Sequence, residues 1–280
     1  MRAPLTFVLL TLLEVCWPRA PGSLCDDDDK WTRVWGDEFD TFDRSIWTVP
    51  LGVNNSFGRA ANVTEEDTYV EDGKLVLRSR EVVAGRSWAT GAAISNHRSY
   101  THNVSGISWQ YGRFCVRAQL PGAGPGRSQG LWPAHWMMPV NHSRHCGYNE
   151  IDILEMINGD GTAWGTYWYW GTGGGGPAGS NCSGAHKPTR AGPSAGVKVP
   201  DYHSSYHEYA IEWTPTALTF FVDSTPYLSF SNPAQLPVNA HYIMLNSAVG
   251  GSWPGPPNAS TVFPAYHKID YVRVSQRHTS

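Results

Sequence analysis

Short runs of apolar or alternating residues recur along the chain from Trp31 onward, and segments rich in Gly, Pro and Asn separate them. The runs are rich in Val, Ile, Tyr, Trp, Phe and Thr, which favour strands, and none has the spacing of an amphipathic helix. The pattern predicts strands at residues 74–79, 111–120, 131–138, 150–157, 163–169, 206–213, 217–223, 241–249 and 268–275. Such a series indicates an all-β sandwich of two antiparallel sheets.

Three segments rich in Gly and Pro, at residues 121–130, 171–200 and 250–260, predict long loops between these strands. Long loops on a rigid sandwich are frequent places of binding. Nothing in the composition marks an internal boundary. Because all-β sandwiches commonly run to about 250 residues, we expect one domain over residues 31–280.

The first residues have a different character. Arg2 precedes an apolar run at residues 5–17, and Ala20-Pro21-Gly22 follows as a small-residue cleavage site. This arrangement predicts a secretory signal peptide over residues 1–22. A membrane anchor is not expected, because the run is shorter than the roughly 20 residues that a span needs. Export agrees with six Asn-x-Ser/Thr glycosylation acceptors, at Asn54, Asn62, Asn103, Asn141, Asn181 and Asn258.

Residues 23–30 form an acidic pro-segment or linker that ends in four Asp residues and Lys30. Four acids before a Lys resemble the enteropeptidase site of trypsinogen-like precursors, so an activating protease could cut after Lys30. An acidic solvated linker and a laboratory fusion remnant are the alternatives.

Four cysteines, Cys25, Cys115, Cys146 and Cys182, remain once Cys16 leaves with the signal peptide. An oxidising compartment predicts disulfides, with three pairings open. We favour Cys146–Cys182, because these residues lie in loops on either side of one predicted strand.

The charge and the aromatic content limit the classes of ligand that the protein is expected to bind. The 280 residues carry a net charge of −3, which gives no support to nucleic-acid or anionic-membrane binding. The 13 Trp and 13 Tyr residues exceed what a core needs and suggest a surface that stacks on a flat ligand. A nearly neutral domain suits a neutral polymer.

The segment at residues 150–157 carries the clearest chemistry. In a strand, Glu150 and Asp152 share one face while Ile151 occupies the other. A single-residue bulge at Ile153-Leu154 would return Glu155 to the face of Glu150 and Asp152. Three adjacent carboxylates would raise at least one pKa, since no Lys or Arg in the segment neutralises them.

Three interpretations of this carboxylate row stay open: a solvated outer face, a calcium site, and acid–base chemistry on a sugar. We favour the last, because glycoside hydrolysis needs one ionised and one protonated carboxyl group across the scissile bond. The short spacing favours the retaining form. Asp152, in the middle, can help to keep the two pKa values apart.

The chain also resembles glycoside hydrolase family 16. The bulged pattern Glu-x-Asp-x-x-Glu stands at Glu150, Asp152 and Glu155, and further similar motifs occur in order at residues 35–40, 111–121, 131–139, 207–213, 221–223, 245–255 and 269–274. The resemblance implies a β-jelly-roll sandwich with a concave substrate cleft. It also implies Glu150 as nucleophile, Glu155 as acid/base and Asp152 as helper.

The same resemblance implies further site residues. Trp132 and Trp136 fall on one strand face and are expected to stack on sugar rings, while Arg117, His207, Asn246 and Trp168 are further candidates for binding substrate. Asp270 is a candidate ligand of a structural calcium ion; catalysis itself needs no cofactor. Three departures affect substrate contacts. Cys115 stands where the family commonly has a sugar-binding Glu, and Trp168 stands where it often has a His. The loop at residues 171–200 is longer and richer in Gly than the resemblance leads us to expect.

These observations predict a secreted, monomeric, retaining endo-β-glycanase that cuts a β-linked polysaccharide, with β-1,3-glucan as the favoured substrate. The alternatives are a β-glucan recognition protein without activity, an enzyme of the same fold that acts on galactan or agar, and a transglycosylase.

Overall fold

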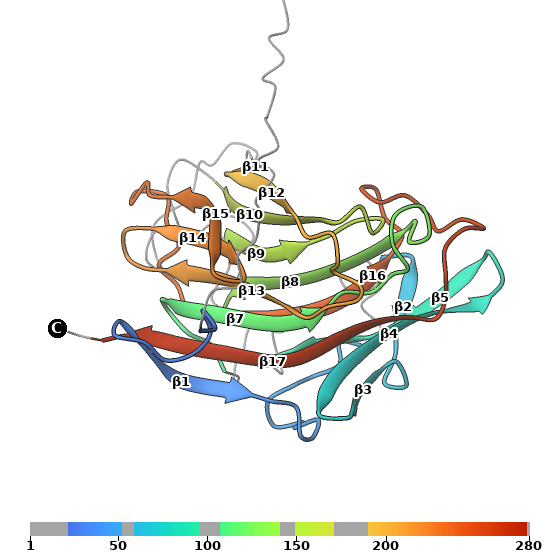
Figure 1. Ribbon diagram of the computed structural model, residues 1–280, viewed down its shortest axis with the longest axis horizontal. Helices are drawn as coiled ribbons and strands as arrows, with labels where there is room; N and C mark the ends of the chain where they lie inside the picture. The colour runs from blue at the N-terminus through green and yellow to red at the C-terminus, as the bar shows by residue number, and fades with distance from the viewer. Residues whose placement is uncertain (1–21, 52–58, 96–106, 141–148, 171–189, 279–280) are drawn as a thin grey trace, which may run out of the picture.

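The computed structural model describes residues 22–51, 59–95, 107–140, 149–170 and 190–278. Within these ranges the chain forms strands and turns and no helix. The strands assemble into two sheets that pack face to face as a β-jelly roll (Figure 1). The predicted all-β sandwich is therefore confirmed. No helix of the described part is long and apolar enough to cross a bilayer.

The larger sheet has ten strands. They are β1 (Trp31–Asp37), β2 (Ala61–Val63), β3 (Thr68–Glu71), β4 (Lys74–Val83), β5 (Ser87–Thr90), β7 (Gly112–Gln119), β13 (His207–Trp213), β14 (Leu218–Val222), β15 (Thr225–Phe230) and β17 (Ala265–Arg277). Their order is β15-β14-β13-β7-β17-β4-β5-β2, with β1 also beside β17 and β3 also beside β4. The pairing of β2 with β5 is parallel, and the other pairings in this sheet are antiparallel.

The smaller sheet has seven strands. They are β6 (Ala92–Ile94), β8 (Leu131–Pro139), β9 (Asn149–Glu155), β10 (Thr162–Trp170), β11 (Arg190–Ala191), β12 (Ser194–Lys198) and β16 (His241–Val249). Their order is β11-β10-β9-β8-β16-β6, with β12 also beside β10. All pairings in this sheet are antiparallel.

The core lies between the two sheets and follows from the alternation of side chains along each strand. Phe114 and Val116 of β7 belong to the same buried cluster as Ile151 and Leu154 of β9. Cys115 of β7 and Asp152 of β9, which lie between these core residues in the sequence, point to the outer faces of the sandwich. The outer face of the smaller sheet, which points away from the core, can therefore carry a functional site.

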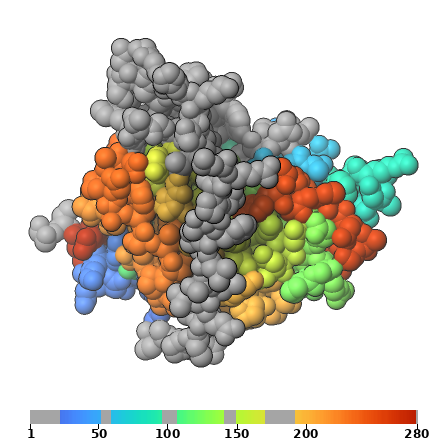
Figure 2. All heavy atoms as spheres, turned by 90° about the horizontal axis from the view of Figure 1, so that it is seen from above, coloured from blue at the N-terminus to red at the C-terminus, as the bar shows by residue number. Residues whose placement is uncertain are grey.

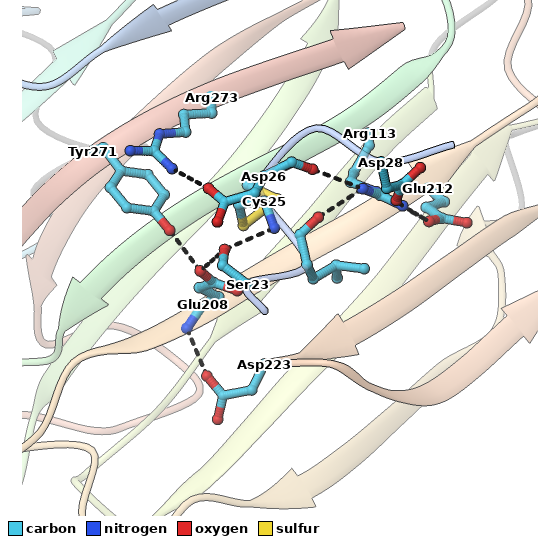
Figure 3. The surroundings of a disulfide bond; sticks show 12 residues. Ser23, Cys25, Asp26, Asp28, Arg113, Glu208, Glu212, Asp223, Tyr271 and Arg273 are labelled. Carbon is cyan, nitrogen blue, oxygen red and sulfur yellow. Dashed lines mark hydrogen bonds and ion pairs between the residues drawn. A yellow bond between two sulfur atoms is a disulfide. The ribbon is translucent and has the colours of Figure 1, made fainter. Parts of the chain in front are cut away.

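A second, smaller apolar cluster lies on the outer face of the larger sheet, where residues 22–30 cross it. We call this segment the N-terminal strap (Figure 3). Cys25 of the strap forms a disulfide with Cys115 of β7. Our favoured pair, Cys146–Cys182, lies outside the described residues. The segment predicted to be a pro-segment or linker thus packs on the sheet, and whether it is removed stays a prediction.

The acidic side chains of the strap contact basic groups of the sheet (Figure 3). Asp28 pairs with Arg113 at 2.9 Å, and Asp26 pairs with Arg273 at 3.0 Å. Arg113 is only 4% exposed and also pairs with Glu212 at 2.8 Å. Burial alone would raise the pKa of Asp28, but hydrogen bonds from the Lys30 backbone and from Arg113 lower it overall. The acidic run is therefore engaged with the fold.

The predicted loops and termini can be compared only in part. Residues 121–130 and 250–260 are loops as predicted. The predicted loop at 171–200 contains β11 and β12, while residues 171–189 lie outside the described residues. Residues 1–21 of the signal peptide predicted over residues 1–22 also lie outside the described residues, as do the acceptors Asn54, Asn103, Asn141 and Asn181. The two described acceptors, Asn62 and Asn258, are exposed.

Candidate active site

A β-bulge in β9 brings the three carboxylates to one face of the smaller sheet. Across β8, Trp136 is opposite Asp152 and His135 is opposite Leu154, so that Ile153 is the extra residue. The register of β10 shifts at the same point. Ile153 and Leu154 are both buried in the core, and Glu155 consequently returns to the face of Asp152. The predicted bulge is confirmed.

The three carboxylates lie in one pocket on the outer face of the smaller sheet. Strands β8, β9 and β16 form its floor. The described residues that line it are Arg59, Trp132, Ala134, Trp136, Glu150, Asp152, Glu155, Asn246 and Ala248. The structure thus brings together the predicted catalytic residues and three of the predicted binding residues, namely Trp132, Trp136 and Asn246. Small residues at 134 and 248 keep the floor open between the large indoles.

Indole N–H groups donate hydrogen bonds to polar groups of this pocket. Nε1 of Trp132 donates to Oε1 of Glu155 at 3.0 Å, and Nε1 of Trp168 donates to Oδ2 of Asp152 at 2.8 Å. Nε1 of Trp136 donates to Oδ1 of Asn246 at 2.7 Å. Trp132 and Trp168, which we predicted to contact substrate, therefore also contact the carboxylates directly.

One wall of the pocket was not predicted from the sequence. The guanidinium of Arg59 lies 4.6 Å from the ring centroid of Trp132, and Trp253 meets the same ring edge-on at 5.6 Å. Trp253 is 42% exposed and also contacts Trp164 of β10. In Figure 2 the orange-red atoms around residues 250–260 reach the surface beside the yellow-green atoms of the β9–β10 region. Trp253 stands in a loop, where no periodicity could assign it to a face.

Arg117 and His207 lie on the larger sheet, away from the pocket, which corrects the expectation that they reach the cleft. Arg117 of β7 contacts Asp270 and lies over the ring of Tyr206. Cys115 lies on the same face of β7 and is bonded to the strap. The position at which the resemblance leads us to expect a sugar-binding Glu therefore contributes nothing to the pocket. Alternation along β7 groups Cys115 with Arg117 correctly but places both on the outer face of the larger sheet.

His207 of β13 lies between two carboxylates. Its Nδ1 is 3.0 Å from Oδ2 of Asp223, and its Nε2 is 3.1 Å from Oδ1 of Asp201. Burial alone would lower the pKa of His207, but the two carboxylates raise it above its ordinary value. His207 therefore joins β13 to neighbouring turns and does not serve the pocket.

The surroundings of Asp270 do not fit a calcium ion. Its carboxylate contacts Arg117 and lies 3.4 Å from the ammonium group of Lys74. Calcium sites gather several oxygen ligands, whereas two cations face this carboxylate. Among the described residues, no group of three or more His, Cys, Asp or Glu side chains could hold a metal ion.

The pocket has the parts that glycoside cleavage requires. Adjacent carboxyl groups can divide the roles of nucleophile and proton donor, and flat indoles offer apolar faces to sugar rings. A β-jelly roll with this pocket defines a class of glycoside hydrolases. The chain belongs to the Glycosyl hydrolases family 16, whose sequence model matches residues 58–273. The resemblance inferred from the motifs is thereby confirmed.

The similar proteins include enzymes named for β-glucan. A Beta-glucanase of Rhodothermus marinus is 30% identical over 89% of this chain and 87% of its own length. The Clotting factor G alpha subunit of Tachypleus tridentatus is also 30% identical, over 90% of this chain but only 35% of its own length. The laminarinase catalytic domain of Thermotoga maritima superposes with a TM-score of 0.70 at 26% identity, covering 90% of this chain and all of that domain.

Proposed function

We propose that the protein is a retaining endo-β-1,3-glucanase. The observation that carries this proposal is the bulge in β9, which gathers Glu150, Asp152 and Glu155 in one indole-lined pocket. Family membership makes the chain a glycoside hydrolase. Relatives named Beta-glucanase and laminarinase support β-glucan as the substrate, and their similarity covers 89% and 90% of this chain.

In the proposed first step, the carboxylate of Glu150 attacks the anomeric carbon of the sugar in the pocket. Glu155 gives its proton to the glycosidic oxygen as that bond breaks, and a glycosyl ester on Glu150 remains. In the second step, Glu155 takes a proton from water, and the water oxygen attacks the anomeric carbon and releases Glu150. Two displacements at one carbon retain its configuration.

Asp152 lies between the two glutamates along the strand and faces the same pocket. Its charge disfavours a second and third negative charge nearby, so the group of three holds a proton at pH values where an isolated carboxyl would be ionised. Glu155 can thereby keep the proton it must deliver. The three carboxyl groups share their protons, so Asp152 influences the protonation of Glu155 and takes part in the chemistry as a helper.

The test is release of reducing ends from laminarin, lichenan, agarose and β-1,3-galactan, with Glu150→Gln as control. We expect release from laminarin, with a rate at least about 10³-fold lower in the control, because the nucleophile is lost. Proton NMR of the first product should show the β-anomer. Activity on galactan or agarose alone would change the substrate, and a first product of α-configuration would exclude retention.

A recognition protein that binds β-glucan without cutting it is the second candidate. One relative of equal identity is named as a clotting factor and not as a hydrolase. Affinity electrophoresis in gels that contain laminarin separates the two candidates. Retarded migration without any release of reducing ends, in intact protein and in protein cut after Lys30, would favour recognition.

We also propose that the protein is secreted. The apolar run at residues 5–17 and the small residues after it support a signal peptide. The Cys25–Cys115 disulfide agrees with an oxidising compartment. Expression in a eukaryotic secretory host tests this, because exported protein should appear in the medium with its mature N-terminus after Gly22 or after Lys30.

A further inference from the structure

Resting on the proposed function, we infer that Trp132 and Trp168 are positioning residues for the acid–base chemistry. Their indole N–H groups hold one oxygen each of Glu155 and Asp152 as permanent hydrogen-bond acceptors. The mobile protons of the pocket are thereby confined to the opposite oxygens, Oε2 of Glu155 and Oδ1 of Asp152.

The first contact joins neighbouring strands. Trp132 of β8 is two residues from Ala134, which is opposite Glu155 of β9 in the register. The 3.0 Å bond from Nε1 to Oε1 of Glu155 therefore runs diagonally across the two strands. Trp132 is only 9% exposed, and Arg59 and Trp253 pack on its ring. A ring held on several sides can fix the carboxyl that it contacts.

The second contact comes from the other side of β9. Trp168 of β10 is opposite Glu150, while Thr166 is opposite Asp152, so the indole again reaches diagonally. Its Nε1 lies 2.8 Å from Oδ2 of Asp152, which is only 3% exposed. The carboxylates of β9 thus receive one indole donor from each neighbouring strand.

The chemistry of indole decides what these contacts do. Its N–H is a donor only and does not titrate in the working range of an enzyme. A carboxyl oxygen that accepts a hydrogen bond from indole cannot also place an acidic proton along that hydrogen bond. The acidic proton is therefore carried by the other oxygen of the carboxyl group. A donor also favours the ionised carboxylate and lowers its pKa, which opposes the effect of three adjacent acids.

Few other charged groups line the pocket among the described residues. Glu150 is the third acid, and Arg59 is the one cation among the described lining residues. Strands β8 and β16 contribute Trp132, Ala134, Trp136, Asn246 and Ala248 to the described lining, none of which titrates. The pH dependence should therefore be set by the three acids, by Arg59 and by the two indole donors.

The test replaces indole by a ring without a donor. Trp132→Phe should raise the pKa of Glu155 and move the alkaline limb of the kcat/KM profile up by about one pH unit. Trp168→Phe should raise the pKa of Asp152 and move the acid limb upward by a similar amount, because Asp152 and Glu150 share protons. Trp253→Phe is the matched control, which should change KM and leave both limbs in place.

A second measurement does not depend on activity. In protein with ¹³C-labelled Asp and Glu carboxyl groups, Trp132→Phe should raise the titration midpoint of one Glu, and Trp168→Phe that of one Asp. If a Phe variant is unstable, benzothienylalanine at the same position keeps the ring shape and replaces the N–H by sulfur. Unchanged midpoints in both variants would overturn the inference.

The two proposals fail differently. Wild-type protein that cuts laminarin, with unshifted limbs in both Phe variants, would remove the positioning role and leave the glucanase intact. Wild-type protein without hydrolytic activity would remove the glucanase, and the ¹³C titrations would still decide whether the indoles control the carboxyl protons.

Discussion

His135 of β8 and His267 of β17 share a hydrogen bond inside the sandwich, with their Nε2 atoms 2.9 Å apart. Both side chains are fully buried, and their rings stack at a centroid distance of 5.0 Å. One ring must donate and the other must accept, so at least one of the two imidazoles has to stay neutral. Burial and the neighbouring His267 hold the pKa of His135 well below its ordinary value, and burial lowers that of His267 to about 3.

This pair predicts a loss of stability in mild acid. In the unfolded chain each imidazole takes up a proton near pH 6.5, whereas folded His267 resists protonation down to about pH 3 and the pKa of folded His135 is also well below its ordinary value. The stabilisation is therefore complete above pH 6.5 and is lost as the pH falls below it. Between pH 7.5 and pH 5 we expect His267 to lower the free energy of unfolding by about 2 kcal/mol, and His135 to add to this loss in the same direction.

Urea unfolding at both pH values measures this loss. The control carries His135→Leu together with His267→Leu, which removes both titrating groups and should flatten the difference. An equal loss in the control and in the wild-type protein would assign the pH dependence to other groups.

The site residues show which residue-scale inferences a sequence supports. Alternation placed Glu150 and Asp152 on one face, and placed Trp132 with Trp136, because adjacent positions in one strand fix relative orientation. Alternation does not say which sheet a strand joins, so Arg117 was grouped correctly with Cys115 but expected in the wrong place. The hydrogen bonds of the indoles depend on the register between strands, which a single strand does not encode.

At the scale of elements, the bulge in β9 determines which side of the sheet Glu155 occupies. Two residues separate Asp152 from Glu155, so unbroken alternation would turn Glu155 toward the core, and the extra residue Ile153 returns it to the face of Asp152. Deletion of Ile153 should therefore leave a regular strand in which Asp152 and Glu155 keep their partners in β8, and hydrolysis of laminarin should persist. It should destabilise the fold by about 2 to 5 kcal/mol, because the buried side chain of Ile153 is lost from the core.

Ile153→Val is the matched control, since it keeps the bulge and removes one methylene. It should cost about 1 kcal/mol in unfolding free energy and retain activity. Reducing-end release and urea unfolding measure both effects. A deletion variant that folds but no longer cuts laminarin would contradict this account of the bulge.

The longer strands were predictable because their apolar runs carry enough period-two signal, as in β7, β8, β13 and β16. The short strands β2, β6 and β11, of two or three residues each, were not predicted. Such segments become strands only because a longer neighbour offers its backbone groups, which is a property of the assembled sheet. The same reason explains why β12 lies in a segment for which the sequence predicts a loop.

At the scale of the whole molecule, the N-terminal strap fastens residues 22–30 to the centre of the larger sheet. The carbonyl oxygen of Lys30 accepts a hydrogen bond from the backbone N–H of His278 at 2.9 Å. Asp28 Oδ1 accepts from the backbone N–H groups of Lys30 and Trp31, and the Trp31 side chain is only 3% exposed. The bond that a protease would cut after Lys30 is thus held on both sides.

Cleavage after Lys30 should consequently require local opening of the strap. We expect enteropeptidase to cut the folded protein at least about tenfold more slowly than a peptide of residues 22–36. The cut protein should migrate as one species without reductant and lose the strap fragment with reductant, because Cys25 remains bonded to Cys115. N-terminal sequencing that finds Trp31 identifies the cut. Equal rates for protein and peptide would show that the strap is open in solution.

The disulfide also has a consequence for synthesis. Cys25 and Cys115 follow one another among the cysteines beyond the expected signal peptide, 90 residues apart. A chain that enters an oxidising lumen from its N-terminus presents these two thiols before Cys146 and Cys182 emerge, and domains begin to fold as they are made. Oxidation in the order of translocation therefore yields this bond directly. Its formation should need no disulfide isomerase, whereas a reducing bacterial cytosol would deliver the protein without the covalent bond between the strap and β7.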